Sequence, residues 1–391
     1  MQPVYICGVG MNRFGKYPDR TLRDLAGGPI VDALADAGVQ ARDIQAAFVA
    51  NSMAGIVTGQ EAIRGQTILP AHGISGLPIV NVENACASGS TALHQAVTAV
   101  LAGLYDIVLV LGVEKLFHTD RSVSYRALSS ATDLAESAAG GGSSVFLEES
   151  NRRLAKYMER SGATIAHVAK IAEKSHRNGA RNPLAQYREV YTVDEIMASP
   201  VVTAPLTRLM CSPIGDGAAV LVICSQAAAR RLGRDQVRIA ASVLRSATGQ
   251  SDASMGIAER SVTAAYEMAG IGPGDLNVVE LHDTTAASEL MLYERLGLCP
   301  AGGAPELVDS GATEIGGRVP VNPSGGLISR GHPVGATGVA QICELTWQLR
   351  GAVDGRQVDG ARTAMAHNAG GTVLGEPAAL SIHILTSERR V

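Results

Sequence analysis

A cysteine between small residues is the first feature of this 391-residue chain that could do chemistry. Cys86 lies in the stretch 84–90 (NACASGS), immediately before a predicted long helix. A thiol at a helix N-terminus meets the positive end of the helix dipole and free N–H groups, which favour the thiolate and could hold an oxyanion. Most lone cysteines are ordinary small buried residues, but the neighbouring Ala, Ser and Gly leave room for a substrate. Cys86 is therefore a candidate nucleophile.

Three further stretches place histidine at a predicted strand end or in a glycine-rich loop. They are His282-Asp283, the loop 326–338 (GLISRGHPVGATG) around Gly331 and His332, and His367-Asn368 followed by Gly370 and Gly371. Imidazole gains and loses protons near neutral pH, so these histidines are candidate acids or bases. A capped strand end or a simple turn would also explain the first and the last. The loop lacks the lysine of a G-x-x-x-x-G-K-[ST] phosphate loop, which disfavours nucleotide hydrolysis.

The elements that must position these residues occur twice along the chain. Each half has a short strand (4–9, 237–243), a helix (30–37, 257–269) and a second strand (46–50, 278–281), and a Gly and an Asp five residues apart precede the second strand. A Val-Asn pair, a small-residue turn, a long helix and an apolar strand (107–111, 363–366) then follow in both. Strands alternating with helices predict a mostly parallel sheet, with ligands bound at the carboxyl ends of its strands.

Two segments depart from the repeated unit. Gly27-Gly28-Pro29 interrupts an otherwise helical stretch, 22–37, and should break or kink it. Residues 114–204 are richer in Arg, Ser and Gly and are typical of a helical insertion with loops. Such excursions from an α/β core commonly cover a site.

Composition excludes several functions. The net charge is 33 − 37 = −4 without a block of like charge, which argues against a nucleic-acid binder. The apolar runs fall far short of the roughly 18 residues of a membrane span, and the chain does not start with a secretory signal, so a cytoplasmic protein is expected. The six cysteines form no C-x-x-C pair and the nine histidines no H-x-x-x-H pair. Reduced thiols and no metal site are therefore predicted.

Together these motifs resemble the thiolase superfamily, and most closely its sterol-carrier-protein-type branch. Four stretches carry the likeness, one for each catalytic loop of that family: Asn84-Ala85-Cys86-Ala87-Ser88-Gly89, Glu280-Leu281-His282-Asp283, Gly331-His332-Pro333 and His367-Asn368. The resemblance implies a thiolase fold of the α/β class, with two similar βαβαβαββ halves in a five-layered αβαβα arrangement. The expected parts are an N-terminal half at 1–115 whose core is completed by roughly 205–232, a loop domain at 116–204, and a C-terminal half at 233–391. A homodimer or tetramer is also implied.

The resemblance also implies roles for particular residues. Cys86 would accept the acyl group, His332 would take its proton, and His282 or His367 would act as acid or base at the carbon–carbon step. The remaining implied site residues are Asn368, Gly370 and Gly331 for the oxyanion loops and Ser329 and Asn322 for substrate binding. The substrate would be a coenzyme A thioester, with no bound cofactor.

The chain departs from the family pattern at the second catalytic thiol. Relatives of the sterol-carrier type usually have cysteine and then phenylalanine after His-Asp, where this chain has Thr284 and Thr285. Ordinary thiolases have the second thiol in the last catalytic loop, where this chain has His367. A threonine hydroxyl cannot shuttle protons at neutral pH as a thiol can. An acyltransferase that condenses or cleaves 3-ketoacyl-CoA remains the first hypothesis. The alternatives are a retro-aldol lyase of β-hydroxyacyl-CoA with a small OB-fold partner, and a non-catalytic acyl-CoA-binding protein.

Overall fold

A nine-stranded sheet runs through the computed structural model, which describes residues 2–137, 145–233, 236–249 and 255–387. The strand order is β3-β2-β4-β7-β1-β8-β11-β10-β9. The strands are β1 (Val4–Met11), β2 (Ala46–Ala50), β3 (Ile79–Val82), β4 (Ile107–Glu114), β7 (Gly217–Ser225), β8 (Val237–Ser246), β9 (Val278–Glu280), β10 (Thr363–Gly370) and β11 (Ala379–Ser387), and a separate ribbon pairs β5 (Val201–Thr203) with β6 (Leu206–Thr207).

The prediction of a mostly parallel sheet is wrong. Only the β3–β2, β2–β4 and β10–β9 pairs are parallel, and the other five neighbouring pairs are antiparallel. Parallel pairing holds where a strand returns through a helix. Four of the antiparallel pairs, β4–β7, β7–β1, β1–β8 and β8–β11, join strands from distant parts of the chain, so the local alternation of strand and helix does not determine their direction. The fifth, β10–β11, joins consecutive strands through a short connection without a helix.

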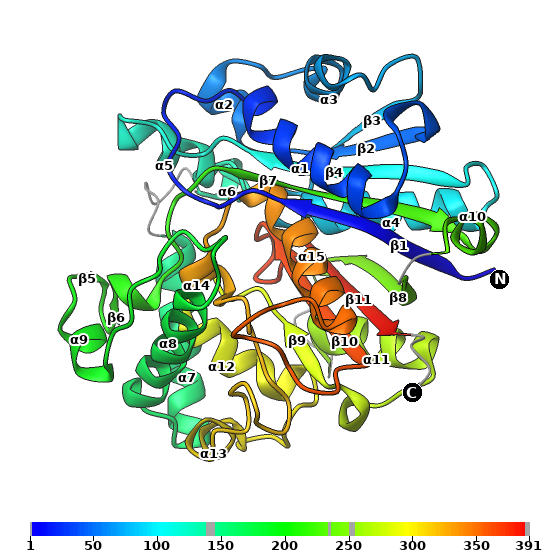
Figure 1. Cartoon of the computed structure of the whole chain (residues 1–391). Helices are drawn as coiled ribbons and strands as arrows, with labels where there is room; N and C mark the ends of the chain where they lie inside the picture. Colours follow the sequence, from blue (N-terminus) through cyan, green and yellow to red (C-terminus); the bar gives the residue numbers. More distant parts are fainter. Residues whose placement is uncertain (1, 138–144, 234–235, 250–254, 388–391) are drawn as a thin grey trace.

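Helices form the other layers, and Figure 1 shows α15 (Thr337–Arg350) at the centre of the molecule. The long helices of the two halves are α1 (Leu22–Ala37), α4 (Ser88–Leu101), α11 (Ile257–Ala269), α12 (Ala286–Arg295) and α15 (Thr337–Arg350). One hydrophobic core joins α4 and α15 to strands of both halves. A second core lies between α1 and the other face of β1, β2, β4 and β7. A third lies between the helices α11 and α12 and the strands β8, β9 and β11. These cores give the five layers of the predicted fold.

The segment between the halves is mostly helical, as the sequence predicts. Its helices are α5 (Arg121–Ser129), α6 (Leu134–Ser137), α7 (Val145–Ser161), α8 (Ile165–Ala180) and α9 (Val193–Ala198). The α7 and α8 helices pack against α12, and α8 also packs against α14 (Gly326–Arg330). The short helices α2 (Ala54–Thr58), α3 (Arg64–Ile68), α10 (Gln226–Leu232) and α13 (Ala304–Asp309) complete the structure. Within the described ranges, no helix is both long and apolar enough to cross a bilayer.

The predicted break at Gly27-Gly28-Pro29 does not occur, because α1 continues from Leu22 to Ala37. Pro29 is buried inside the helix. The helix lies unusually close to β1: a Cβ added at Gly10 would come within 2.2 Å of the Pro29 carbonyl oxygen. This close packing against the sheet, together with a capping box at Thr21, outweighs the local preference of the sequence.

The expectation that all six cysteines are reduced is also wrong. Cys7 and Cys224 form a disulfide, although 217 residues separate them. They come together because β1 and β7 are antiparallel neighbours, a pairing that cysteine spacing in the sequence does not reveal. Cys86 and three other cysteines are free thiols.

Candidate active site

A strained turn presents Cys86. Residues Ala85–Ala87 form one 3-10 turn directly before α4, and Ala85 has a φ of 48°, a conformation that costs a residue with a side chain roughly 1 kcal/mol or more. Side chains hold this conformation. The Asn84 N–H donates to the Ser88 hydroxyl oxygen at 2.8 Å, and the Ala85 N–H donates to the Glu83 carboxylate at 2.6 Å. The thiol is therefore fixed at the amino end of a central helix, as predicted.

Cys86 is a thiol and not the thiolate that its helix position suggests. Burial raises its pKa from 9.0 to about 12; the Gly371 N–H opposes this shift, whereas the buried carboxylate of Glu114 adds to it. Burial of the sulfur thus outweighs the backbone N–H groups that favour the thiolate, although the pocket leaves the residue partly exposed. Its activation must therefore come from a neighbouring base.

Two histidines lie next to this thiol. The Cys86 sulfur and one ring nitrogen each of His282 and His332 all lie within 4.8 Å of one another. The two rings meet edge to face, with centroids 5.1 Å apart. His282 follows β9 and His332 follows α14, so residues from distant parts of the chain converge as predicted. Thiol and imidazole are also ligands that zinc accepts, so this cluster could hold a metal ion, which motif spacing in the sequence does not indicate.

Hydrogen bonds fix His332 as an acceptor toward the thiol. Its Nδ1 lies 2.7 Å from the Thr337 hydroxyl oxygen, and that hydroxyl donates to the Pro333 carbonyl at 3.0 Å. Because the Thr337 hydroxyl donates its only proton to Pro333, it can only accept from His332, and Nδ1 of His332 must carry the hydrogen of their bond. Nε2 of His332 then has a free lone pair, which is what a general base for Cys86 requires.

His282 and His367 have the opposite arrangement. The Asn368 side-chain nitrogen lies 3.1 Å from Nδ1 of His282 and donates to it, and the backbone N–H of His282 donates to Nδ1 of His367 at 3.4 Å. Because both Nδ1 atoms accept, both Nε2 atoms carry hydrogen. His367 is not part of the 4.8 Å cluster, and its buried Nε2 has no hydrogen-bond partner within the described part of the chain.

All three histidines are neutral at physiological pH. Burial lowers the pKa of His332 to about 3, with a further contribution from the Arg330 charge, and lowers that of His367 to about 4, with a contribution from Arg295. The pKa of His282 falls well below 6.5 through burial and through the neighbouring rings. The site is therefore a neutral thiol facing a neutral imidazole acceptor, with further imidazole N–H donors beside them.

Glu114 links the His332 loop to the segment that follows β2 and was not found from the sequence. Its fully buried carboxylate accepts the N–H groups of Ser52 and Met53 at 3.1 and 3.2 Å and that of Gly335, in the His332 loop, at 2.9 Å. Burial raises its pKa. An acidic residue at the end of the apolar strand β4 was the signal available for it.

A buried ion pair supports the two histidine loops and was also missed. The Arg330 guanidinium, 1% exposed, donates to Glu280 at 2.9 Å, and the hydroxyl and backbone N–H of Ser324 donate to the same carboxylate. Glu280 ends β9 just before His282, and Arg330 precedes His332 by two residues. The pair therefore connects the loop of one histidine to the loop of the other.

The structure places Ser329 and Asn322 away from the pocket. Both are fully buried. The Ser329 hydroxyl donates to the Tyr187 carbonyl at 2.9 Å, and the Asn322 side chain donates to Glu289 at 2.7 Å and accepts from the Leu281 N–H. These contacts support the loops, and they leave no group of either side chain directed at a ligand. Gly331 has a φ of 107°, which glycine adopts easily, and so lets the chain turn into His332.

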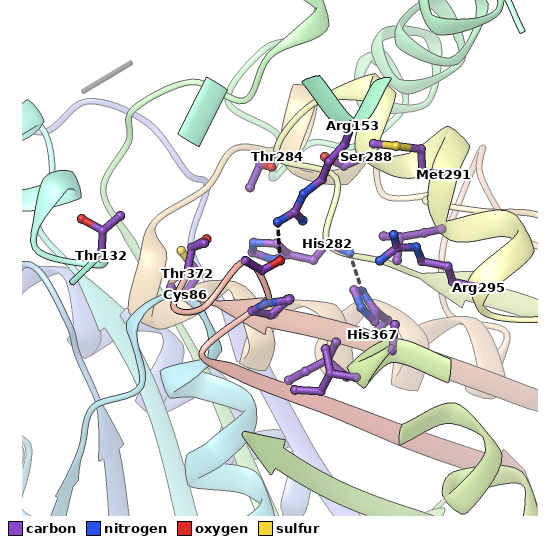
Figure 2. A pocket seen from close by; sticks show the side chains of 18 of the residues that line it. Cys86, Thr132, Arg153, His282, Thr284, Ser288, Met291, Arg295, His367 and Thr372 are labelled. Carbon is purple, nitrogen blue, oxygen red and sulfur yellow. Dashed lines mark hydrogen bonds between the residues drawn. The ribbon is translucent and has the colours of Figure 1, made fainter. Parts of the chain in front are cut away.

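A pocket of about 540 Å³ opens onto Cys86, His282 and His367. Figure 2 shows these side chains with Arg153 of α7 and Arg295 of α12 pointing into the same space. Thr284, at the position of one missing thiol, also lines it. Sequence reasoning did not find the arginines, because arginine is common on helices and nothing in the local sequence shows that these side chains share a pocket.

We expect Gly370→Ala to destabilise the protein by about 1–3 kcal/mol, because the added methyl would overpack the Cys86 turn. A Cβ at Gly370 would lie 2.3 Å from the Asn84 carbonyl oxygen and 2.4 Å from the Ala87 nitrogen. Urea unfolding measures the loss. Gly28→Ala in α1 is the matched control, since no atom lies within 4 Å of its new Cβ and the helix should gain up to about 1 kcal/mol. Equal stability of both variants would contradict the close packing.

Comparisons with known proteins agree over nearly the whole chain. The family model for the thiolase N-terminal domain matches residues 4–227, and that described as thiolase C-terminal domain-like matches residues 240–382. The chain is 38% identical to an acetyl-CoA acetyltransferase of Methanothermobacter thermautotrophicus over 95% of its length and 97% of that protein. It is 37% identical to human sterol carrier protein 2 (95% and 70%) and to benzoylsuccinyl-CoA thiolase subunit BbsB of Thauera aromatica (94% and 94%).

Solved structures share the fold. An Ltp2-ChsH2(DUF35) aldolase superposes with a TM-score of 0.81 at 23% identity, covering 100% of this chain and 99% of that one. Human mitochondrial 3-ketoacyl-CoA thiolase superposes with a TM-score of 0.77 at 17% identity, covering 99% of both. At these identities the structures support the architecture alone.

Proposed function

The chain belongs to the thiolase family, and on this basis we propose that it is an acyltransferase that cleaves or forms 3-ketoacyl-CoA through an acyl-enzyme on Cys86. The observation that carries the proposal is the cluster of the Cys86 sulfur with ring nitrogens of His332 and His282 within 4.8 Å, beside the pocket. Relatives named acetyl-CoA acetyltransferase and thiolase support the same class of reaction. Coenzyme A thioesters are then its substrates, and no resident cofactor takes part.

The first step moves the Cys86 proton to Nε2 of His332 as the sulfur attacks the 3-keto carbon of the substrate. The bond between C2 and C3 then breaks, and its electron pair leaves with the acetyl-CoA enolate. The Nε2–H of His282 supplies a hydrogen bond to the developing oxyanions, and the N–H groups of Cys86 and Gly371 stabilise negative charge on the sulfur. The product on the protein is a thioester between the acyl group and Cys86.

A single base can carry the proton through both halves of the reaction. His332 returns the proton to C2 of the enolate and so releases acetyl-CoA. Coenzyme A then gives its thiol proton to His332, its sulfur attacks the acyl-enzyme, and Cys86 leaves and recovers the proton. We therefore assign proton transfer to His332 and donor roles to His282 and His367, since the Nδ1 atoms of the last two already accept hydrogen bonds. This scheme needs no second thiol.

Intact mass measures the acyl-enzyme directly. Incubation with acetyl-CoA or a longer acyl-CoA should raise the mass of the protein by one acyl group, and Cys86→Ala should remove the increase completely. Cys211→Ala is the matched control, because Cys211 is also a free thiol but does not line the pocket. An adduct that survives in Cys86→Ala, or no adduct with any donor, would refute the proposal.

The departure from the family pattern at Thr284 and His367 leaves two other functions to be tested. Without a second thiol, a retro-aldol lyase of β-hydroxyacyl-CoA acting with a small OB-fold partner is the second candidate. The Thauera relative is named as a subunit, so a partner protein, in addition to a homodimer or tetramer, is part of the proposal. Release of aldehyde or ketone from a β-hydroxyacyl-CoA, with no mass adduct, would favour the lyase. Tight acyl-CoA binding without any product would favour a binding protein.

A further inference from the structure

The charge of the pocket differs from that of the whole chain. Among the described residues that line the pocket, Arg152, Arg153 and Arg295 are cationic and none is acidic, whereas the chain carries a net charge of −4. Three positive charges around one pocket favour an anionic ligand.

One face of α12 forms a graded wall of this pocket. Its four lining residues have the spacing i, i+3, i+4 and i+7, which places them on one helix face: Ser288, Met291, Leu292 and Arg295. The wall therefore begins with a hydroxyl, continues with two apolar side chains and ends in a guanidinium about 10 Å away. A ligand of matching shape has an apolar chain that ends in a negative charge.

The guanidinium of Arg295 is only loosely held within the protein. Its Nε lies 3.8 Å from the Glu259 carboxylate, which is longer than a hydrogen bond, and its side chain is 43% exposed. A second donor accompanies it: Nε2–H of His367, a residue only 2% exposed, lines the same pocket and has no partner within the described residues. Figure 2 shows His367 and Arg295 next to each other on the side of the pocket opposite Cys86.

We propose that Arg295 and His367 bind a carboxylate at the far end of the acyl chain, so that the substrates are ω-carboxyacyl-CoA thioesters. The inference rests on the proposed function. Met291 and Leu292 contact the methylene groups, and the two donors contact the carboxylate oxygens. The phosphates of coenzyme A share this anionic chemistry. They are separated from the thioester sulfur by the pantetheine arm, whereas His367 adjoins the reacting cluster through its bond to the His282 N–H.

Binding to Cys86→Ala tests the proposal without requiring acyl transfer. The probes are succinyl-, adipyl- and suberyl-CoA, each compared with butyryl-, hexanoyl- or octanoyl-CoA of the same length, measured by calorimetry. At least one carboxylated ester should bind about tenfold or more tightly than its partner. Adding Arg295→Met should abolish that preference, and Arg295→Lys should keep part of it. Arg42→Met, at an exposed site outside the pocket, should leave the preference unchanged.

Two additional binding measurements distinguish a carboxylate site from a phosphate site. Pantetheine thioesters of the same acids lack the phosphates, and the preference for the carboxylated ester should persist with them. If Arg295→Met instead weakens binding of the carboxylated and the uncarboxylated CoA ester equally, and does not weaken binding of the pantetheine esters, the arginine binds phosphate and the proposal is overturned. Glu259→Gln removes the partner of Arg295 and should preserve or strengthen the preference. No preference at any chain length would also overturn it. Absence of an acyl adduct in the mass experiment would refute the acyl-enzyme but not the carboxylate site, since binding to Cys86→Ala is measured without acyl transfer.

Discussion

Replacement of His332 by asparagine should lower the rate constant for acylation of Cys86 by about 10²–10⁴-fold. The Cys86 thiol, with a pKa of about 12, is almost fully protonated at neutral pH, and Nε2 of His332 is the acceptor that the hydrogen bonds to Nδ1 leave open. Single-turnover acylation with acetyl-CoA, followed by mass, measures the rate constant. His94→Asn is the control, since that histidine bonds Ser242 outside the site and should change the rate little.

The same site predicts a flat pH profile. The neutral pair is the dominant form between the pKa of His332, about 3, and that of Cys86, about 12. We expect the wild-type acylation rate constant to vary less than about threefold between about pH 5 and pH 9. A bell-shaped profile with a limb near neutrality would indicate a thiolate–imidazolium pair and contradict the neutral mechanism.

Glu280→Gln should destabilise the protein by about 3–5 kcal/mol, because it leaves the Arg330 guanidinium buried without a counter-charge. Arginine cannot lose its proton to escape this cost. Arg330→Met should cost less, since the Glu280 carboxyl can take up a proton when its partner is removed. Urea unfolding of the two variants and of the double variant measures the difference, and the double variant should be more stable than the sum of the single losses implies.

The pH dependence of Arg330→Met provides a check with a definite sign. Burial already raises the pKa of Glu280 above its ordinary value of 4.5, and removal of the arginine raises it further. The folded state then binds this proton more tightly than the unfolded state does. The contribution to stability is present at low pH and is lost as pH rises through the raised pKa, so the variant should lose more stability relative to wild type at about pH 8 than at about pH 5. Equal losses at the two pH values would show that the carboxyl stays ionised.

Local patterns predicted the elements of the fold better than their arrangement. Apolar runs such as 46–50 and 107–111 are strands at the predicted places, because strands buried on both faces must be continuously apolar. Strand direction, the Cys7–Cys224 disulfide and the unbroken α1 depend on which elements become neighbours. That information lies in contacts between residues distant in the sequence.

The candidate site shows the same division. Motifs located Cys86, His282 and His332, whose residue types and small neighbours are unusual. They did not indicate which ring nitrogen carries hydrogen, because Thr337 and Asn368 determine this through contacts in space. The sequence did not indicate Arg295 or Glu114 for a related reason. A charged residue in a helix or at a strand end is common, and only the folded structure shows that Arg295 lines the pocket and that Glu114 is buried.

The central position of α4 and α15 has a consequence for how the two halves depend on each other. Each helix belongs to a different half of the sequence, yet both bury their apolar sides in one core with strands from both halves. Either half alone would expose to water the apolar surface that the other half covers, so this part of the hydrophobic gain arises only when both are present. The duplicated sequence is therefore a single thermodynamic unit, in which a substitution beneath Cys86 on α4 also alters the support of the His332 loop at the start of α15.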